Sequence, residues 1–314
     1  MKQRIECIDN AKGILIVLVV WGHILPDKSI LKQFIYIFHM PAFFIISGIL
    51  FNYSKILDIS IWKAVAKKLY TLIIPYVFFE LIAITLDIAV HGAYQNIQGY
   101  MYDMLTLNVL NYADWFLPVL FLGEICFVFV CKNVLSIYAR ILSGVSAVLI
   151  SVFLSLYWER VGIISKVALC YAFLVLGYYG YRLFEKNNVV IIVISLFIIV
   201  IATGITSQLG IENMRTSKCF TFMLAAIAGT YCIIQLAKLK CFDIFNFFGK
   251  NSLIVMGTHV PILTFLLGSG IPLLKISLDL GAGIFLLGLI MILEIPIIFL
   301  LENYLPYVVG KNKI

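Results

Sequence analysis

Of the 314 residues, 63% are hydrophobic and 12% are charged, about half the charged fraction of a soluble domain. The mean hydropathy of +1.06 and the apolar runs from end to end exclude an ordinary soluble protein and indicate one integral membrane domain over residues 1–314. The net charge of +7 comes from lysines scattered through short loops, not from a clustered basic face, so it does not indicate binding to nucleic acid.

Ten apolar segments are long enough to cross a lipid bilayer as helices, which takes about 20 residues each. The sequence therefore predicts an all-α, polytopic membrane protein whose ten helices form one bundle. The first segment is short, and its first turns are expected to extend back towards Ile5. The expected spans are residues 11–25, 34–51, 69–90, 115–131, 138–157, 167–184, 189–206, 219–237, 253–273 and 280–301.

The distribution of Lys and Arg predicts the orientation of these spans, because positive charge is retained on the cytoplasmic side. With Met1 inside, 15 of the 23 Lys and Arg residues fall on the cytoplasmic side and 7 on the outer side. We therefore expect a multi-pass protein of the cytoplasmic membrane with both termini in the cytoplasm. The first ten residues are too polar and acidic for a cleaved signal peptide, so the first span should remain as a helix.

The first span combines an acidic–basic pair with a histidine. Asp9 precedes Lys12 by about one turn, and His23 follows Lys12 by eleven residues, close to three turns or roughly 16 Å along a helix. One helical face should therefore carry charge at the cytoplasmic edge and an imidazole in the outer half of the membrane. Ionisable groups in lipid usually mark functional sites, although a lone histidine in an apolar helix is more often a packed, hydrogen-bonded residue.

The second span carries a histidine beside a proline, in the run His39-Met40-Pro41, and ends near Ser47-Gly48. Proline removes a backbone donor and bends a helix, and polar side chains beside a bend can line a cavity. The alternative is a kinked packing helix in which His39 bonds to a freed carbonyl. Further ionisable residues fall within later spans: Glu80, Asp87, Glu124, His259 and Glu294.

The connection from His91 to Asp114 contains no Lys or Arg and is rich in Tyr and Asn. On the expected topology it faces outward. Connections of this length are often functional, and aromatic side chains suit sugar stacking. An interfacial helix that seals the bundle is the alternative.

These features together resemble the acyltransferase-3 family of membrane O-acyltransferases, and are most similar to its fucose 4-O-acetylase-like branch. In that family a basic residue, ten intervening residues and a histidine mark the first span, and Lys12 and His23 match this spacing. Similar features recur along the whole chain: Phe38-His39-Met40-Pro41, Lys67-Lys68 before Pro75-Tyr76, Trp115-Phe116-Leu117, and Ser252 followed by His259-Val260-Pro261.

One motif of the family is absent from its expected place. Many members carry Arg-x-x-Arg just before the proline of the third span, and this motif is thought to engage the acyl donor. Here Lys63, Lys67 and Lys68 occupy that region without an arginine. A lysine can contact a phosphate as a point charge, but it lacks the bidentate geometry of arginine.

The resemblance implies acyl-CoA, usually acetyl-CoA, as the donor and an extracytoplasmic or lipid-linked glycan as the acceptor. We expect His23 to act as the general base, with Asp9 and Lys12 as an ordering pair or donor contact. The face from Lys12 to His23 would let the pantetheine arm reach inward. The donor phosphates would meet Lys63, Lys67 and Lys68, and the substrate contacts would come from His39, Ser47, Trp115, Glu124 and His259.

A secondary transporter or flippase for a lipid-linked sugar is the rival interpretation, with the same buried polar groups serving as a proton relay. Transporters commonly show two related halves, and this sequence has no such repeat. The enzyme is therefore favoured. The seven cysteines form no CxxC pair, so we expect neither a disulfide nor a metal site, and the oligomeric state is left open.

Overall fold

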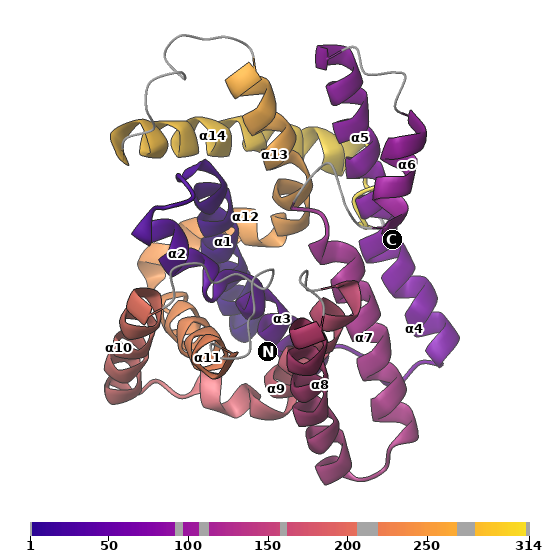
Figure 1. Cartoon of the computed structure of the whole chain (residues 1–314), viewed down its shortest axis with the longest axis vertical. Coiled ribbons are helices and arrows are strands. Elements are labelled where there is room, and N and C mark those ends of the chain that lie inside the picture. Colours follow the sequence, from indigo (N-terminus) through magenta and orange to yellow (C-terminus); the bar gives the residue numbers. More distant parts are fainter. Residues whose placement is uncertain are drawn as a thin grey trace.

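The computed structural model describes residues 2–91, 97–106, 113–157, 162–205, 219–268 and 280–311 (Figure 1). These residues are almost entirely helical, and no strand occurs among them, which confirms the all-α prediction. The first half of the chain forms α1 (Lys2–Ile24), α2 (Ile30–Tyr36), α3 (His39–Phe51), α4 (Ile61–Lys68), a π-helical segment (Leu69–Ile73), α5 (Ile74–His91), α6 (Ile97–Thr106), α7 (Phe116–Asn133) and α8 (Ile137–Tyr157). The second half forms α9 (Ile163–Glu185), α10 (Val189–Ile205), α11 (Cys219–Leu236), a 3₁₀ segment (Lys240–Phe245), α12 (Asn246–Lys250), α13 (Ser252–Gly268) and α14 (Leu280–Tyr304).

Within the described ranges, eight helical stretches are long and apolar enough to cross a membrane. A bent pair, Lys240–Lys250 with Ser252–Leu267, meets at 75° and can form a ninth. The remaining expected span corresponds to α10, an apolar helix of 17 described residues. Each of the ten expected segments is thus helical over most of its described residues, while residues 206 and 269–273 of two of them lie outside the described residues. The clear spans number eight or nine because α10 is short and the chain bends sharply before α13.

The third span begins earlier than the sequence predicted. Helical structure runs without interruption from Ile61 to Ala89, 29 residues, and includes the π-helical segment Leu69–Ile73. The long connection after it contains α6, as the interfacial-helix alternative expects, while residues 92–96 and 107–112 of that connection lie outside the described residues.

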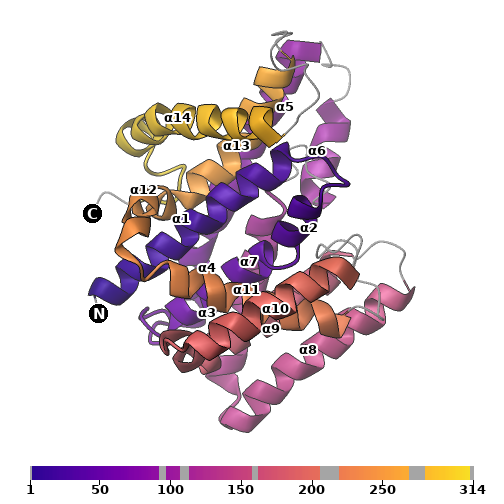
Figure 2. The same ribbon diagram turned by 90° about the vertical axis from the view of Figure 1, so that its left-hand side faces the viewer.

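Both chain ends lie on the same side of the molecule, at the left of Figure 2. From that side α1 crosses to the opposite face, so His23, in its last turn, lies far from both ends. An even number of membrane crossings places both chain ends on the same side. Large apolar side chains are exposed along the outside of α8 and α10, among them Leu149 and Phe197, which are 64% and 66% exposed. In a bundle surrounded by lipid, such side chains face the hydrocarbon.

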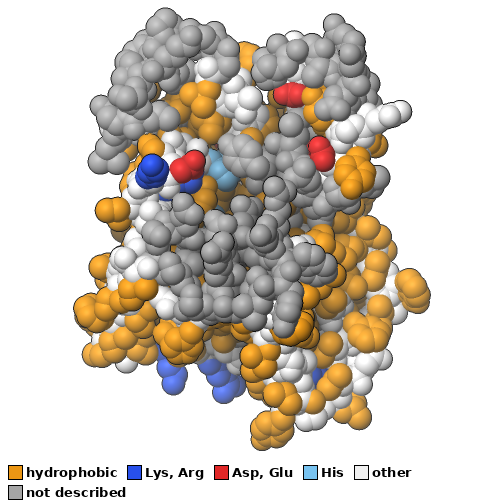
Figure 3. All heavy atoms as spheres, in the orientation of Figure 1, with side chains coloured by type: hydrophobic (Ala, Val, Ile, Leu, Met, Phe, Trp, Pro, Cys, Tyr) orange, Lys and Arg blue, Asp and Glu red, His pale blue; other side chains and the backbone are white. Residues whose placement is uncertain are grey.

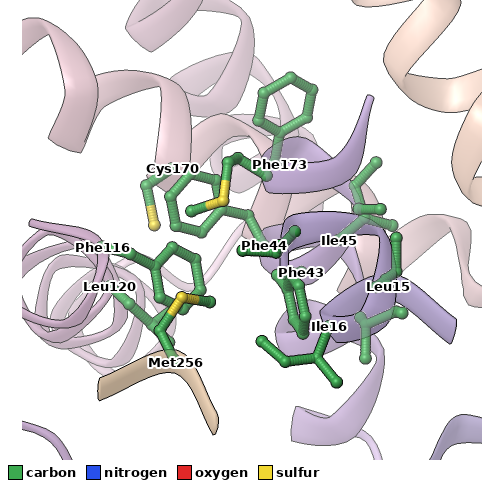
Figure 4. Packing of buried hydrophobic residues seen from close by; sticks show 14 of the residues in the cluster. Leu15, Ile16, Phe43, Phe44, Ile45, Phe116, Leu120, Cys170, Phe173 and Met256 are labelled. Carbon is green, nitrogen blue, oxygen red and sulfur yellow. The ribbon is translucent and has the colours of Figure 1, made fainter. Parts of the chain in front are cut away.

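The core lies where α1, α3, α7, α9 and α13 meet (Figure 4). Leu15 and Ile16 of α1 are fully buried. Phe44 of α3 stacks on Phe116 of α7 with ring centroids 5.0 Å apart, and Met256 of α13 lies beside Phe116. This packing fixes α1 between the two helices that carry the other intramembrane histidines.

Two glycines allow α3 and α9 to cross with their backbones in contact. A Cβ at Gly48 would overlap the carbonyl of Leu174, and a Cβ at Gly177 would overlap the carbonyl of Ile45. Small residues are the usual means of close helix approach in membranes, where apolar side chains gain nothing by leaving lipid. The Ser47-Gly48 pair of α3 thus lies at a close helix approach, and α9 is the partner.

We expect Gly177→Ala to lower the melting temperature of the detergent-purified protein, because the backbone of Ile45 cannot rotate away from the added methyl group. Gly180→Ala on the same helix is the matched control. There the new Cβ would meet only the Leu176 side chain, at 3.6 Å, and alanine favours the helix over glycine by about 1 kcal/mol. A Gly177→Ala protein that melts no lower than Gly180→Ala would show that the crossing tolerates separation.

Candidate active site

Four helices, α1, α2, α3 and α13, bring three histidines and a tyrosine into one cluster. The ring centroids of His23 and His259 are 5.2 Å apart. The ring of Tyr36 lies 4.8 Å from that of His39, and its hydroxyl lies 3.3 Å from Nδ1 of His23. We term His23, Tyr36, His39 and His259 the histidine cluster. The sequence singled out all three histidines separately, and the fold joins them.

Two of these rings are fixed by carbonyls in their own chain segment. Nδ1 of His39 lies 3.0 Å from the carbonyl oxygen of Ile35, and Nδ1 of His259 lies 2.7 Å from that of Val255. A carbonyl only accepts, so Nδ1 donates in both rings and Nε2 keeps its lone pair. Both histidines are buried. For His39 this is the contact that the packing alternative expected, and it also sets the tautomer.

The helix is interrupted just before the proline. The chain leaves helical geometry at Ile37 and Phe38, and Pro41 is the third residue of α3. Ile37 lies four residues before Pro41, and a proline in a helix disturbs the carbonyl at this position because it lacks the N–H and its ring meets that oxygen. The interruption between α2 and α3 thus lies where Pro41 is expected to disturb the span.

Tyr36 was not singled out by the sequence, although it orients His23. Its hydroxyl is 3.3 Å from the carbonyl oxygen of Gly22 and 3.3 Å from His23 Nδ1. If the phenol donates to Gly22, its oxygen can accept from Nδ1–H, which leaves Nε2 of His23 as the basic nitrogen. A Cβ at Gly22 would lie 2.5 Å from the Tyr36 ring. The glycine beside His23 was the available signal for such a close approach.

His23 is the member of the three that is partly exposed. Figure 3 shows a histidine side chain near the middle of the face opposite the chain ends. Beside the cluster, the Lys32 ammonium lies 5.3 Å from the centre of the Tyr36 ring and 2.8 Å from the Asp27 carboxylate. The hydrogen bond from Lys32 lowers the pKa of the Asp27 carboxyl, which lies in the turn after α1. The approach to His23 from this face is therefore polar.

A buried carboxylate bonds to the residue before His259 and ties α13 to α14. The Thr258 hydroxyl is 2.9 and 2.8 Å from the two carboxylate oxygens of Glu294, and 2.8 Å from the carbonyl oxygen of Ile254. Glu294 is fully buried. This contact fixes the residue immediately before His259.

Asp9 and Lys12 form the ion pair that their spacing predicts, with Nζ and Oδ1 2.8 Å apart. On the face of α1 between this pair and His23, three side chains are packed into the core: Leu15, Ile16 and Val19, each at most 1% exposed. The face along which a pantetheine arm was expected to reach His23 is therefore filled by apolar side chains in this structure.

The three lysines expected to meet the donor do not lie together. Lys63 and Lys67 are exposed on α4. Lys68 turns into the bundle, where its ammonium lies 2.8 Å from the Glu124 carboxylate and 5.2 Å from the centre of the Phe51 ring. Lys68 and Glu124 were assigned to different substrates from sequence, and the structure makes them a buried ion pair.

The remaining expected substrate contacts are placed elsewhere. Trp115 precedes α7, and the Lys166 ammonium lies over its ring at 4.5 Å. Ser47 follows His39 by eight residues, about 12 Å along α3, at the turn where Gly48 meets α9. Within the described ranges, no group of three or more His, Cys, Asp or Glu side chains is arranged to hold a metal ion.

Comparisons with known proteins agree with the resemblance seen in the motifs. Residues 5–301 match the acyltransferase-3 family model, described as an acyltransferase domain. The chain is 30% identical over 190 residues to the nodulation protein NolL of Sinorhizobium fredii (strain NBRC 101917 / NGR234), covering 57% of this chain and 49% of that protein. It is 32% identical over 143 residues to the nodulation protein NolL of Mesorhizobium japonicum (strain LMG 29417 / CECT 9101 / MAFF 303099), covering 42% of this chain and 36% of that protein. The matches thus span half or less of these relatives, and no solved structure matches the chain.

The ion pair between Lys68 and Glu124 can be tested by breaking and replacing it. Lys68→Met or Glu124→Gln alone should lower the melting temperature, because each leaves a charge in the bundle without its partner, at a cost on the order of 3 kcal/mol. The double variant Lys68→Met/Glu124→Leu should recover most of the loss. Lys67→Met, on the exposed side of the same helix, should melt like the parent protein. Additive losses in the double variant would contradict the pairing.

Proposed function

Because this chain belongs to the acyltransferase-3 family, we propose that it transfers an acyl group, typically acetyl, from cytoplasmic acyl-CoA to a hydroxyl of an extracytoplasmic or lipid-linked glycan. The observation that carries the proposal is the histidine cluster. It holds three imidazoles and a phenol inside a membrane bundle, with His23 partly exposed in the last turn of α1. Placing such a group of ionisable rings inside a membrane costs free energy, and groups of this kind usually mark a functional site.

Acyl transfer to a hydroxyl needs a base for the proton, and His23 is suited to that role. Its Nδ1 faces the Tyr36 hydroxyl, so Nε2 can take the proton of the acceptor hydroxyl. The hydroxyl oxygen then attacks the thioester carbonyl, the carbon–sulfur bond breaks, and the leaving thiolate takes the proton back from the imidazolium. Imidazole is suited to both steps because its unperturbed pKa lies near 6.5.

Support for the donor side comes from charge near the chain ends. Coenzyme A is a polyanion, and Lys63 and Lys67 are exposed on α4, while Lys12 is partly exposed beside Asp9. Lys68 can contribute a further charge only if it leaves Glu124. Because core side chains fill this face of α1, a pantetheine arm that follows it to His23 requires the neighbouring helices to move apart. We propose that the donor binds at this end and that its phosphates remain there.

We further propose that the protein lies in the cytoplasmic membrane with both termini in the cytoplasm. The excess of Lys and Arg in the corresponding segments supports this orientation, and both chain ends lie on one side of the molecule (Figure 2). His23 would then meet an acceptor that arrives from outside.

The role of His23 is tested by separating chemistry from folding. A His23→Ala protein should remain monodisperse and still bind acyl-CoA, but lose transfer by about a hundredfold or more, the scale of a general base. His23→Gln should fail similarly, because an amide does not take up a proton at neutral pH. Acceptor-dependent release of the coenzyme A thiol is the readout, with the melting temperature as the folding control. Near-normal turnover in folded His23→Ala would remove this mechanism, and His39 or His259 would be the next base to test.

A further inference from the structure

One polar atom of the histidine cluster has no partner. Nε2 of His259 is buried and has no hydrogen-bond partner, and the whole residue is 0% exposed. Buried polar atoms are nearly always hydrogen-bonded, and the bilayer interior offers no bulk water as a substitute. A hydrogen-bond donor that reached this nitrogen would complete the cluster.

The tautomer of His259 determines which kind of group can bond to Nε2. Nδ1 of His259 gives its hydrogen to the carbonyl oxygen of Val255 at 2.7 Å. In the neutral ring Nε2 then carries a lone pair and no hydrogen, so it can only accept. An oxyanion as the partner would need a charged imidazolium at a fully buried position. A hydroxyl donor needs no added charge.

The orientation of the His259 ring is constrained by its neighbours. Gly257, two residues before it, packs directly on Phe79 of α5, where a Cβ would overlap the phenyl ring. Thr258 is bonded to Glu294 of α14. Neighbours on two sides and the bond to Val255 thus fix the orientation of the imidazole. A fixed acceptor of this kind is suited to selecting a ligand rather than adapting to one.

We propose that Nε2 of His259 accepts a hydrogen bond from a second hydroxyl of the acceptor, on the carbon next to the hydroxyl that His23 deprotonates. The inference rests on the proposed function. The two rings have centroids 5.2 Å apart and are tilted by 37°, so they border the same small region. His39, also with Nδ1 on a carbonyl, adds another accepting nitrogen nearby. A site that presents accepting nitrogens fits a sugar with adjacent free hydroxyls, and disfavours a simple alcohol.

The kinetic test uses methyl hexopyranosides and their mono-deoxy analogues as acceptors. The protein should prefer the glycoside to the analogue lacking the neighbouring hydroxyl by at least about a hundredfold in kcat/KM, because the analogue leaves Nε2 unpaired. His259→Phe should lose most of this preference, and His259→Gln should retain part of it, since an amide oxygen accepts. Thr264→Val, at an exposed position of the same helix, is the control and should behave as the parent.

The second test does not depend on turnover or on any variant that must fold. In histidine-labelled protein, ¹⁵N spectra at neutral pH should show His259 with a protonated Nδ1 and an unprotonated Nε2. Adding the methyl glycoside, but not its deoxy analogue, should shift the Nε2 signal. A protonated Nε2 would overturn the proposal. Equal spectra with both compounds would also overturn it, and would mean that a buried water is the hydrogen-bond partner of His259.

The transfer assay separates this proposal from the proposed function. Equal transfer to both acceptors would overturn the role of His259 but leave the acyltransferase function standing, whereas no thiol release with any glycan would count against that function.

Discussion

Every polar group inside this bundle must find a partner within the protein, because the bilayer core supplies none. Several side chains meet this constraint with partners close by. His39 and His259 each bond to a carbonyl four residues earlier, and Lys68 pairs with Glu124. Within the histidine cluster, Nε2 of His259 is a buried atom without a hydrogen-bond partner. In a soluble protein a water molecule could bond to such an atom, whereas the bilayer core supplies no bulk water for this nitrogen.

The same constraint explains how the site is assembled. Apolar side chains gain little by leaving lipid, so close backbone contact at glycines draws the helices together. Gly48 and Gly177 join α3 to α9, and Gly22 lets the Tyr36 ring approach α1. With Phe44 and Phe116 stacked behind it, α1 presents His23 to α13. The same packing fills the face of α1 between His23 and the pair of Asp9 and Lys12 with apolar side chains.

The sequence predicted most of the helices because hydropathy and length determine them, and spacing alone predicted the pair of Asp9 and Lys12. It could not reveal that Lys68 meets Glu124, since that contact depends on how far α4 turns inward before the π-helical segment. Nor could it identify Tyr36, whose role arises only when α2 folds against α1. Contacts between distant segments depend on helix rotation, which hydropathy does not encode.

We propose that the protein passes an acyl group from a donor on the side of the chain ends to an acceptor on the other side. Proteoliposomes with acetyl-labelled acetyl-CoA sealed inside and glycan outside test it most directly. We predict labelled ester on the outer glycan and an equal amount of free coenzyme A thiol inside the vesicles. Movement of glycan into the vesicles without thiol release would instead indicate a transporter, and ester that forms only when both substrates share one side would contradict transfer across the bundle.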